Sequence, residues 1–179
     1  KTEFEDVPNI SPYLTALSTV FIKNRTKPLS DLPELLIGSK PADHGGLTSK
    51  DLGVWHSGKN DPIARKYIRP YLGAEELIKG KERWCLWITP ENYNPEDIKN
   101  SKFLMSRIKI VKDFRLKSPK KPTREAAKRP YSFEEIREVT ENYLAIPRHF
   151  TADREYFTAS YEVPDKEWGL PIAGDALYT

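Results

Sequence analysis

Basic side chains in loops are the residues of this sequence with the clearest chemistry. Three loop-like segments, NRTKP, GSKPADHGG and PRHFTADR, hold basic and small polar residues: Arg25, Lys27, Lys40, Arg148, His149, Thr151 and Arg154. A guanidinium can donate two hydrogen bonds to a guanine edge, and hydroxyl groups contact either bases or phosphates. Each of these residues alone is typical of an ordinary surface, but together they predict contact with a nucleic acid.

The charge of the chain is unevenly distributed. From Lys102 to Arg129 there are eleven basic residues and two acidic ones, a net charge of +9, whereas the whole chain carries +3 and the remainder therefore −6. Residues 117–130, KSPKKPTREAAKRP, contain three prolines and no periodicity, so we expect an extended loop that could follow a phosphate chain. Its candidate phosphate contacts are Lys120, Lys121 and Arg124.

Motifs of catalysis are missing from the sequence. It has no Gly-rich turn for a nucleoside cofactor, no Asn/Asp-Pro-Pro-aromatic motif, no phosphate-binding Gly-Lys-Ser/Thr loop and no serine nucleophile elbow. The three histidines and the cysteine do not have the spacing of a metal-binding motif. Acidic pairs such as Glu134 and Glu135 lie near expected helix starts, where carboxylates complement the helix dipole. We therefore expect no catalytic centre, no metal and no cofactor in this chain.

The composition predicts a globular domain that could position the basic loops. Hydrophobic residues make up 38% and aromatic residues 11% of the 179, enough apolar surface for a folded core despite 31% charged residues. No apolar run reaches the roughly 20 residues that span a bilayer, and the first residues do not resemble a signal peptide. Cys85 lies in an apolar run typical of a buried strand. We expect one domain, located in the reducing cytoplasm and away from membranes.

Sequence patterns predict an α+β fold, a single mixed domain with a central sheet. Residues 83–89 form the strongest expected strand, because they hold two Trp, a Cys, a Leu and an Ile without a breaker. Asn94 can cap one long helix near residues 95–117, with Leu104, Ile108 and Val111 facing the core. Further strands are expected at residues 17–22, 34–37, 143–146 and 155–162, and shorter helices from Asp61, at 74–78 and at 132–139. Long Pro- and Gly-rich loops fill the rest.

Several strings of the sequence resemble a known family. They are ISPYL (10–14), NRTKPLSDLPELLIGSKPADHGG (24–46), IRPYLGAEELIKGKERWCLWI (68–88), FRLKSPKKPTREAA (114–127) and YLAIPRHFTADREY (143–156). In the same order, over nearly the whole chain, they closely resemble the target-recognition region of MmeI-like restriction-modification enzymes. The resemblance implies a longer polypeptide with an endonuclease domain, a helical connector and an adenine-N6 methyltransferase. S-adenosylmethionine and Mg²⁺ are then expected in the other domains.

The resemblance also singles out one loop. The segment after Ile146 and Pro147 corresponds to a loop that helps to set base preference in the family, which implicates Arg148, His149, Thr151, Ala152, Asp153 and Arg154. Phe150 and Thr151 stand where the family usually has a small polar pair, a departure that could alter the base that is read. Family members continue beyond the final GDALYT with a further specificity segment. Residues 1–179 are therefore expected to form one target-recognition domain, truncated at its C-terminus.

These observations support three hypotheses of different classes. The leading one is sequence-specific recognition of double-stranded DNA, in which basic loops bind phosphates and the late loop enters the major groove. The rival is an intramolecular docking module, whose aromatic and Pro-rich first half positions the methyltransferase domain of the same polypeptide without reading bases. An independent metal-dependent nuclease is the third, and it rests only on scattered carboxylates.

Overall fold

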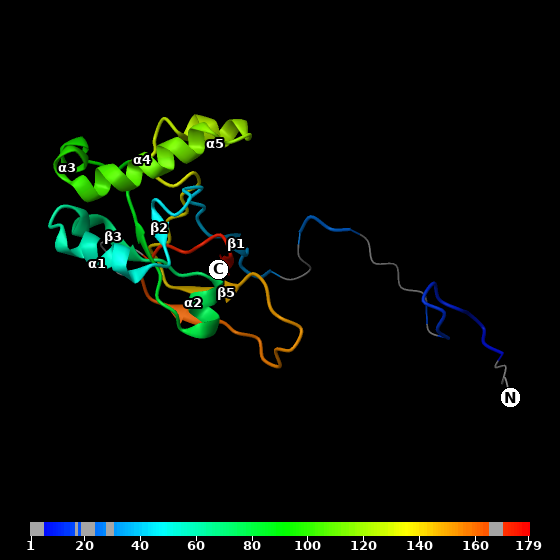
Figure 1. Cartoon of the computed structure of the whole chain (residues 1–179). Helices are drawn as coiled ribbons and strands as arrows, with labels where there is room; N and C mark the ends of the chain where they lie inside the picture. The colour runs from blue at the N-terminus through cyan, green and yellow to red at the C-terminus, as the bar shows by residue number, and fades with distance from the viewer. Residues whose placement is uncertain (1–5, 17, 19–23, 28–30, 165–169) are drawn as a thin grey trace. The chain divides into compact units, whose positions relative to one another are not determined.

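The computed structural model describes residues 6–16, 18, 24–27, 31–164 and 170–179 (Figure 1). The chain divides into two compact units, residues 1–33 and residues 34–179. Within the first unit, the backbone N–H of Ser11 donates to the carbonyl of Thr15, which closes a turn. The strand expected at residues 17–22 lies outside the described residues apart from Ser18. The helices and strands of the described part belong to the second unit.

The second unit mixes helices and strands along the chain, which confirms the predicted α+β class. The elements are β1 (Leu36–Ile37), β2 (Thr48–Ser49), α1 (Leu52–Asn60), a 3-10 helix (Ala64–Tyr67), β3 (Ile68–Pro70), α2 (Ala74–Lys79), β4 (Trp84–Leu86), α3 (Pro95–Asn100), α4 (Lys102–Leu116), α5 (Lys121–Ala126), β5 (Tyr143–Pro147), β6 (Ser160–Glu162) and β7 (Ala176–Tyr178).

The strands form two antiparallel sheets instead of the single central sheet that the sequence predicts. One sheet has the order β1-β7-β5-β6, and the other has the order β2-β4-β3. The strand expected at residues 83–89 is β4, shorter than predicted and central in the smaller sheet. The strand expected at 155–162 is reduced to β6 because residues 148–159 form a long loop. This loop joins the antiparallel neighbours β5 and β6.

The helix expected near residues 95–117 is interrupted at Ser101. Asn94 caps α3 as predicted, because its side-chain oxygen accepts a hydrogen bond from the N–H of Glu96. Ser101 has extended backbone angles and ends α3. Its hydroxyl accepts from the N–H of Leu104 at 3.0 Å and so begins α4. The hydroxyl also donates to Asp61 Oδ2 at 2.5 Å, a long-range contact that fixes the break.

Further predictions of local structure are wrong. The stretch 117–130 is not an extended loop, because it contains α5 with Pro122 in its first turn, where proline is tolerated. No helix forms at 132–139; there Ser39 Oγ accepts from the N–H of Arg137 and donates to its carbonyl. The Pro- and Gly-rich first sixty residues hold α1, and the helix expected from Asp61 is only a 3-10 turn.

Aromatic and aliphatic side chains fill a main core between α4 and the smaller sheet. Trp55, Leu86, Leu104 and Phe133 have almost no exposed surface, and Phe133 packs edge-on against Trp87 with ring centroids 5.1 Å apart. The main cluster also contains Cys85, whose thiol is buried as expected, and burial raises its pKa. A second cluster lies under the larger sheet and includes Tyr143, Ala145, Ile172, Ala176 and Tyr178.

Candidate nucleic-acid interface

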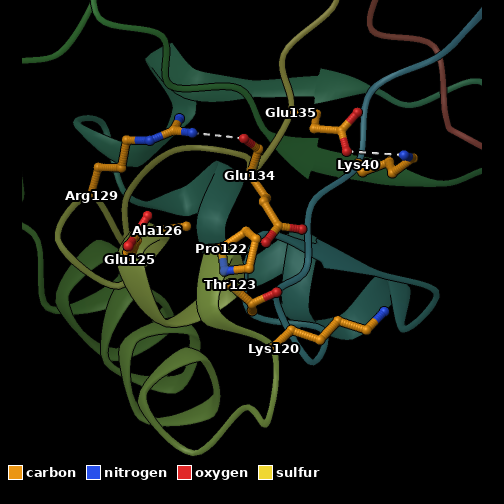
Figure 2. Close-up of a pocket in the computed structure, with 9 residues that line it drawn as sticks. All are labelled: Lys40, Lys120, Pro122, Thr123, Glu125, Ala126, Arg129, Glu134 and Glu135. Carbon is orange, nitrogen blue, oxygen red and sulfur yellow. Dashed lines mark hydrogen bonds and ion pairs between the residues drawn. The ribbon is translucent and has the colours of Figure 1, made fainter.

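A pocket of about 590 Å³ brings together two of the predicted DNA contacts, Lys40 and Lys120 (Figure 2). Lys40 follows β1, and its backbone exchanges hydrogen bonds with that of Glu135. Lys120 precedes α5, where its N–H donates to Ser118 Oγ. Lys121 and Arg124 lie in α5 itself and are exposed. Lys40 and Lys120, two predicted DNA contacts that are far apart in the sequence, therefore line one pocket in the fold.

The same pocket contains acidic side chains that compete for these cations. Lys40 Nζ lies 2.9 Å from Glu135 Oε1, the ion pair drawn in Figure 2. Glu134 points toward Pro122, and its buried Oε1 has no hydrogen-bond partner in the described part of the chain. Carboxylates inside the pocket disfavour a phosphate there. Exposed Lys40 and Lys120 can instead meet an anion at the rim.

One arginine of the basic segment is structural. Arg115 on α4 is fully buried and donates five hydrogen bonds to backbone carbonyls. The acceptors are the carbonyl oxygens of Pro41, Ala42, Ala126, Arg129 and Ser132. Burial, together with the positive charge of Arg129, lowers the pKa of Arg115 to about 10. The guanidinium thus joins the Lys40 segment to α5 and to the chain that follows it.

Three more arginines of that segment donate to backbone carbonyls, so the fold holds their guanidinium groups in place. Arg107 donates to Gly45 and Gly46, Arg124 donates to Ser118 and Pro119, and Arg129 donates to Phe133 and Glu134. The lysines of the segment remain exposed: Lys102, Lys109, Lys112, Lys117, Lys120, Lys121 and Lys128. The burial of Arg115 could have been predicted from the sequence, because Arg115 follows Leu104 and Val111 at helical spacing on the buried face of α4.

The loop between β5 and β6 carries the other predicted contacts. Arg148, His149, Thr151, Ala152, Asp153 and Arg154 are all exposed. The base of the loop is anchored by the N–H of Arg148, which donates to the carbonyl of Asp175 at 3.0 Å. Within the loop, the guanidinium of Arg154 donates to Thr158 Oγ1 from Nε at 3.1 Å and from Nη2 at 2.7 Å. Arg154 is therefore oriented before any ligand binds.

The predicted contacts thus form separate groups. In Figure 1 the β5–β6 loop projects from the larger sheet, well apart from α5. Arg25 and Lys27 belong to the first unit, where both are exposed. Among the described residues, no group of three His, Cys, Asp or Glu side chains could hold a metal ion. No helix in that part of the chain is long and apolar enough to cross a bilayer.

Comparisons with known proteins show which family the chain is similar to. A family described as "MmeI, target recognition domain" matches residues 16–166. "DNA methyltransferase A" of Bacillus subtilis (strain 168) is 36% identical over 150 residues, which are 84% of this chain and 17% of that protein. The solved type IIL restriction-modification enzyme MmeI in complex with DNA is 31% identical, with a TM-score of 0.79. That match covers 96% of this chain and 22% of the enzyme, so the chain spans only a small part of both relatives.

Proposed function

Because this chain belongs to the MmeI target recognition domain family, we propose that it reads the sequence of double-stranded DNA for a longer DNA methyltransferase. The observation that carries the proposal is the projecting loop 148–159 between β5 and β6, which presents Arg148 and the pre-oriented Arg154. In the major groove, arginine can read guanine through two hydrogen bonds. The likeness to an enzyme solved with DNA supports the same function.

The two groups of contacts have different roles in this proposal. Lys40, Lys120, Lys121 and Arg124 bind phosphates, because they are exposed cations that lie outside the projecting loop. The β5–β6 loop reads bases, because its two arginines are offset by Asp153 and Glu155, so it has little net attraction for phosphates. Arg25 and Lys27 are further phosphate contacts. Affinity then depends on salt, and sequence preference depends on the loop.

In this proposal, other domains of the longer polypeptide carry out the catalytic steps. The related methyltransferase and the likeness to a restriction-modification enzyme support a parent of that kind. In our proposal the parent methylates adenine at N6, also cleaves DNA, and works in the bacterial cytoplasm. S-adenosylmethionine and Mg²⁺ would bind to those other domains. This chain would be a non-catalytic reader, a role that fits its missing catalytic motifs. Incubation of the chain with plasmid DNA and Mg²⁺ should leave the plasmid uncut.

Fluorescence anisotropy tests the proposed DNA reading. The chain is titrated into a labelled random-sequence duplex, and then into a duplex selected by the chain from a random pool. We expect weak binding to the random duplex that falls steeply with salt, and tighter binding to the selected duplex. Equal affinity for both duplexes would remove base reading from the proposal. No binding to either at low salt would remove DNA binding altogether.

A docking role is a second candidate function, favoured by the outer face of the larger sheet. Ile37, Leu177 and Ile146 lie side by side across β1, β7 and β5, and Leu144 pairs with Tyr161 on the same face. Leu144 is 42% and Tyr161 63% exposed, so this face is apolar and open. It could pack against the methyltransferase domain. Hydrogen exchange should then be slower at 143–146 and 160–162 in the longer polypeptide than in this chain alone, and equal exchange rates would argue against docking there.

A further inference from the structure

Aromatic side chains are concentrated in the β5–β6 loop and are not buried by the fold. Phe150 and Phe157 pack against each other with ring centroids 5.2 Å apart, tilted by 32°. Phe157 is 69% exposed and Tyr156 is 78% exposed, whereas Phe133 in the core is fully buried. Exposed aromatic groups of this size often mark a binding surface, because burying them against a partner is favourable.

The position of the aromatic pair identifies its partner. Both rings belong to the loop that holds Arg148 and Arg154, and this loop projects from the sheet (Figure 1). The aromatic surface is therefore continuous with the proposed base-reading contacts. Phe157 is adjacent to Thr158, the residue that orients Arg154. A DNA base pair in contact with Arg154 would thus be close to Phe157.

Only one of the ordinary bases offers an apolar group in the major groove. Guanine, cytosine and adenine present hydrogen-bond donors and acceptors there, and thymine adds its 5-methyl group. A phenylalanine ring can contact this methyl group and cannot replace a lost hydrogen bond at another base. The chemistry that matches the exposed face of Phe157 in the groove is therefore a thymine methyl.

We propose that Phe157, supported by Phe150, reads the 5-methyl group of a thymine next to the base pair contacted by Arg154. The inference rests on the proposed DNA reading and deepens it, since it adds an apolar contact to the charged ones. Phe150 braces the ring from one side, so Phe157 does not have to be ordered on binding. This contact sets base preference and adds nothing to phosphate binding.

Substitution of deoxyuridine for thymidine tests the proposal, because it removes only the methyl group. The chain first selects duplexes from a random pool made with thymidine. Each selected duplex is then remade with deoxyuridine at one position at a time, and affinity is measured by anisotropy. Loss of one buried methyl should weaken binding of the wild-type chain roughly fourfold at one position. Equal affinity for all thymidine and deoxyuridine duplexes would overturn the proposal.

Two variants assign the effect to the loop. Phe157→Ala should bind the thymidine and deoxyuridine duplexes equally, with an unchanged melting temperature because the side chain is mostly exposed. Met105→Ala removes a 46% exposed apolar side chain on α4 and should keep the wild-type preference for thymidine. If Phe157→Ala retains that preference, the assignment is wrong. Failure of the wild-type chain to bind any duplex would instead refute the proposed function.

A fluorescent base separates groove contact from intercalation. 2-Aminopurine beside the sensitive position brightens when a side chain inserts and unstacks the base step. We expect no increase upon binding of the wild-type chain, because the ring contacts the methyl group from the groove. A large increase that Phe157→Ala abolishes would show insertion, and it would overturn the methyl-reading proposal.

Discussion

Nη1 of Arg115 lies 2.9 Å from the carbonyl oxygen of Ala126, so a buried guanidinium on α4 holds the last turn of α5. The same nitrogen donates to the carbonyl of Arg129 at 3.0 Å. Nη2 donates to Pro41 at 2.8 Å, in the segment that carries Lys40. The segments that carry the exposed Lys40 and Lys120 are thus held in place by the buried guanidinium of Arg115.

Replacement of Arg115 by methionine should strongly destabilise the fold. The variant removes a donor from five carbonyl groups; those of Ala126 and Arg129 keep a backbone donor, whereas those of Pro41, Ala42 and Ser132 lose the guanidinium that pairs them. Each buried acceptor left without a partner costs about 1–3 kcal/mol. Even after relaxation we expect a loss of about 3 kcal/mol or more in the free energy of unfolding, measured with urea. Lys112→Met, at an exposed position of α4, should change stability by less than about 0.5 kcal/mol. Similar losses in both variants would contradict the structural role.

Local signals in the sequence were sufficient for several elements. Asn94 and Pro95 mark the start of α3, and the helix expected at 74–78 is α2, which ends at Gly80 with a φ of +61°. The uninterrupted apolar run of β4 predicted a central strand. In each case the signal lies within a few residues of the element, so no knowledge of the tertiary fold is needed.

Elements that depend on distant residues could not be predicted. Helix α1 contains Gly58, a poor helix former, yet a side chain there would come within 2.8 Å of Ile68 and Phe103. That close approach, invisible in the sequence, is the reason for glycine. The pocket is a similar case, because the pairing of Lys40 with Glu135 joins residues that are 95 positions apart in the sequence. The basic residues could be found from the sequence, but not their acidic partners.

Removal of the cations beside the pocket should weaken binding to every DNA sequence alike. Lys120→Ala/Lys121→Ala removes two exposed charges and leaves Arg124, which donates to Ser118 and Pro119, to hold the turn. The salt dependence of log K should decrease by roughly 0.9 for each lost phosphate contact. Anisotropy with random and selected duplexes checks this, and Lys99→Ala on α3 is the control. A changed sequence preference would conflict with a phosphate-binding role.

Neutralisation of Glu135 should have the opposite effect. Glu135 pairs with Lys40 at 2.9 Å and with Arg137 at 3.5 Å, so Glu135→Gln frees both cations for phosphate. We expect roughly threefold tighter binding to a random duplex and a steeper dependence on salt. Glu141→Gln makes the same charge change at an exposed position and serves as control. If the affinity for DNA increases equally in both variants, the change in net charge explains the effect and the loss of the ion pair does not.

Tyr67 should make stability sensitive to alkaline pH. Burial, and then its hydrogen bond to Asp97 at 2.8 Å, raise the pKa of Tyr67 to about 12. Because the folded pKa exceeds the unfolded one, the tyrosine stabilises the fold below pH 10, and this stabilisation is lost as pH rises toward 12. The stability advantage over Tyr67→Phe, measured with urea at each pH, should shrink in that window. A constant difference would show that Tyr67 does not titrate with folding.

Removal of the hydroxyl that orients Arg154 should relax base reading without a loss of phosphate binding. Thr158 Oγ1 accepts from Nε and Nη2 of Arg154, and valine has the same shape without the acceptor. In Thr158→Val the guanidinium of Arg154 is free to rotate. Forming two hydrogen bonds to guanine then costs more conformational entropy. Discrimination at one base pair should fall about tenfold, measured with single-substitution duplexes, while affinity for a random duplex stays unchanged. Thr140→Val makes the same change at an exposed position outside the loop and should keep the wild-type discrimination, and loss of discrimination in both variants would point to a general disturbance of the fold.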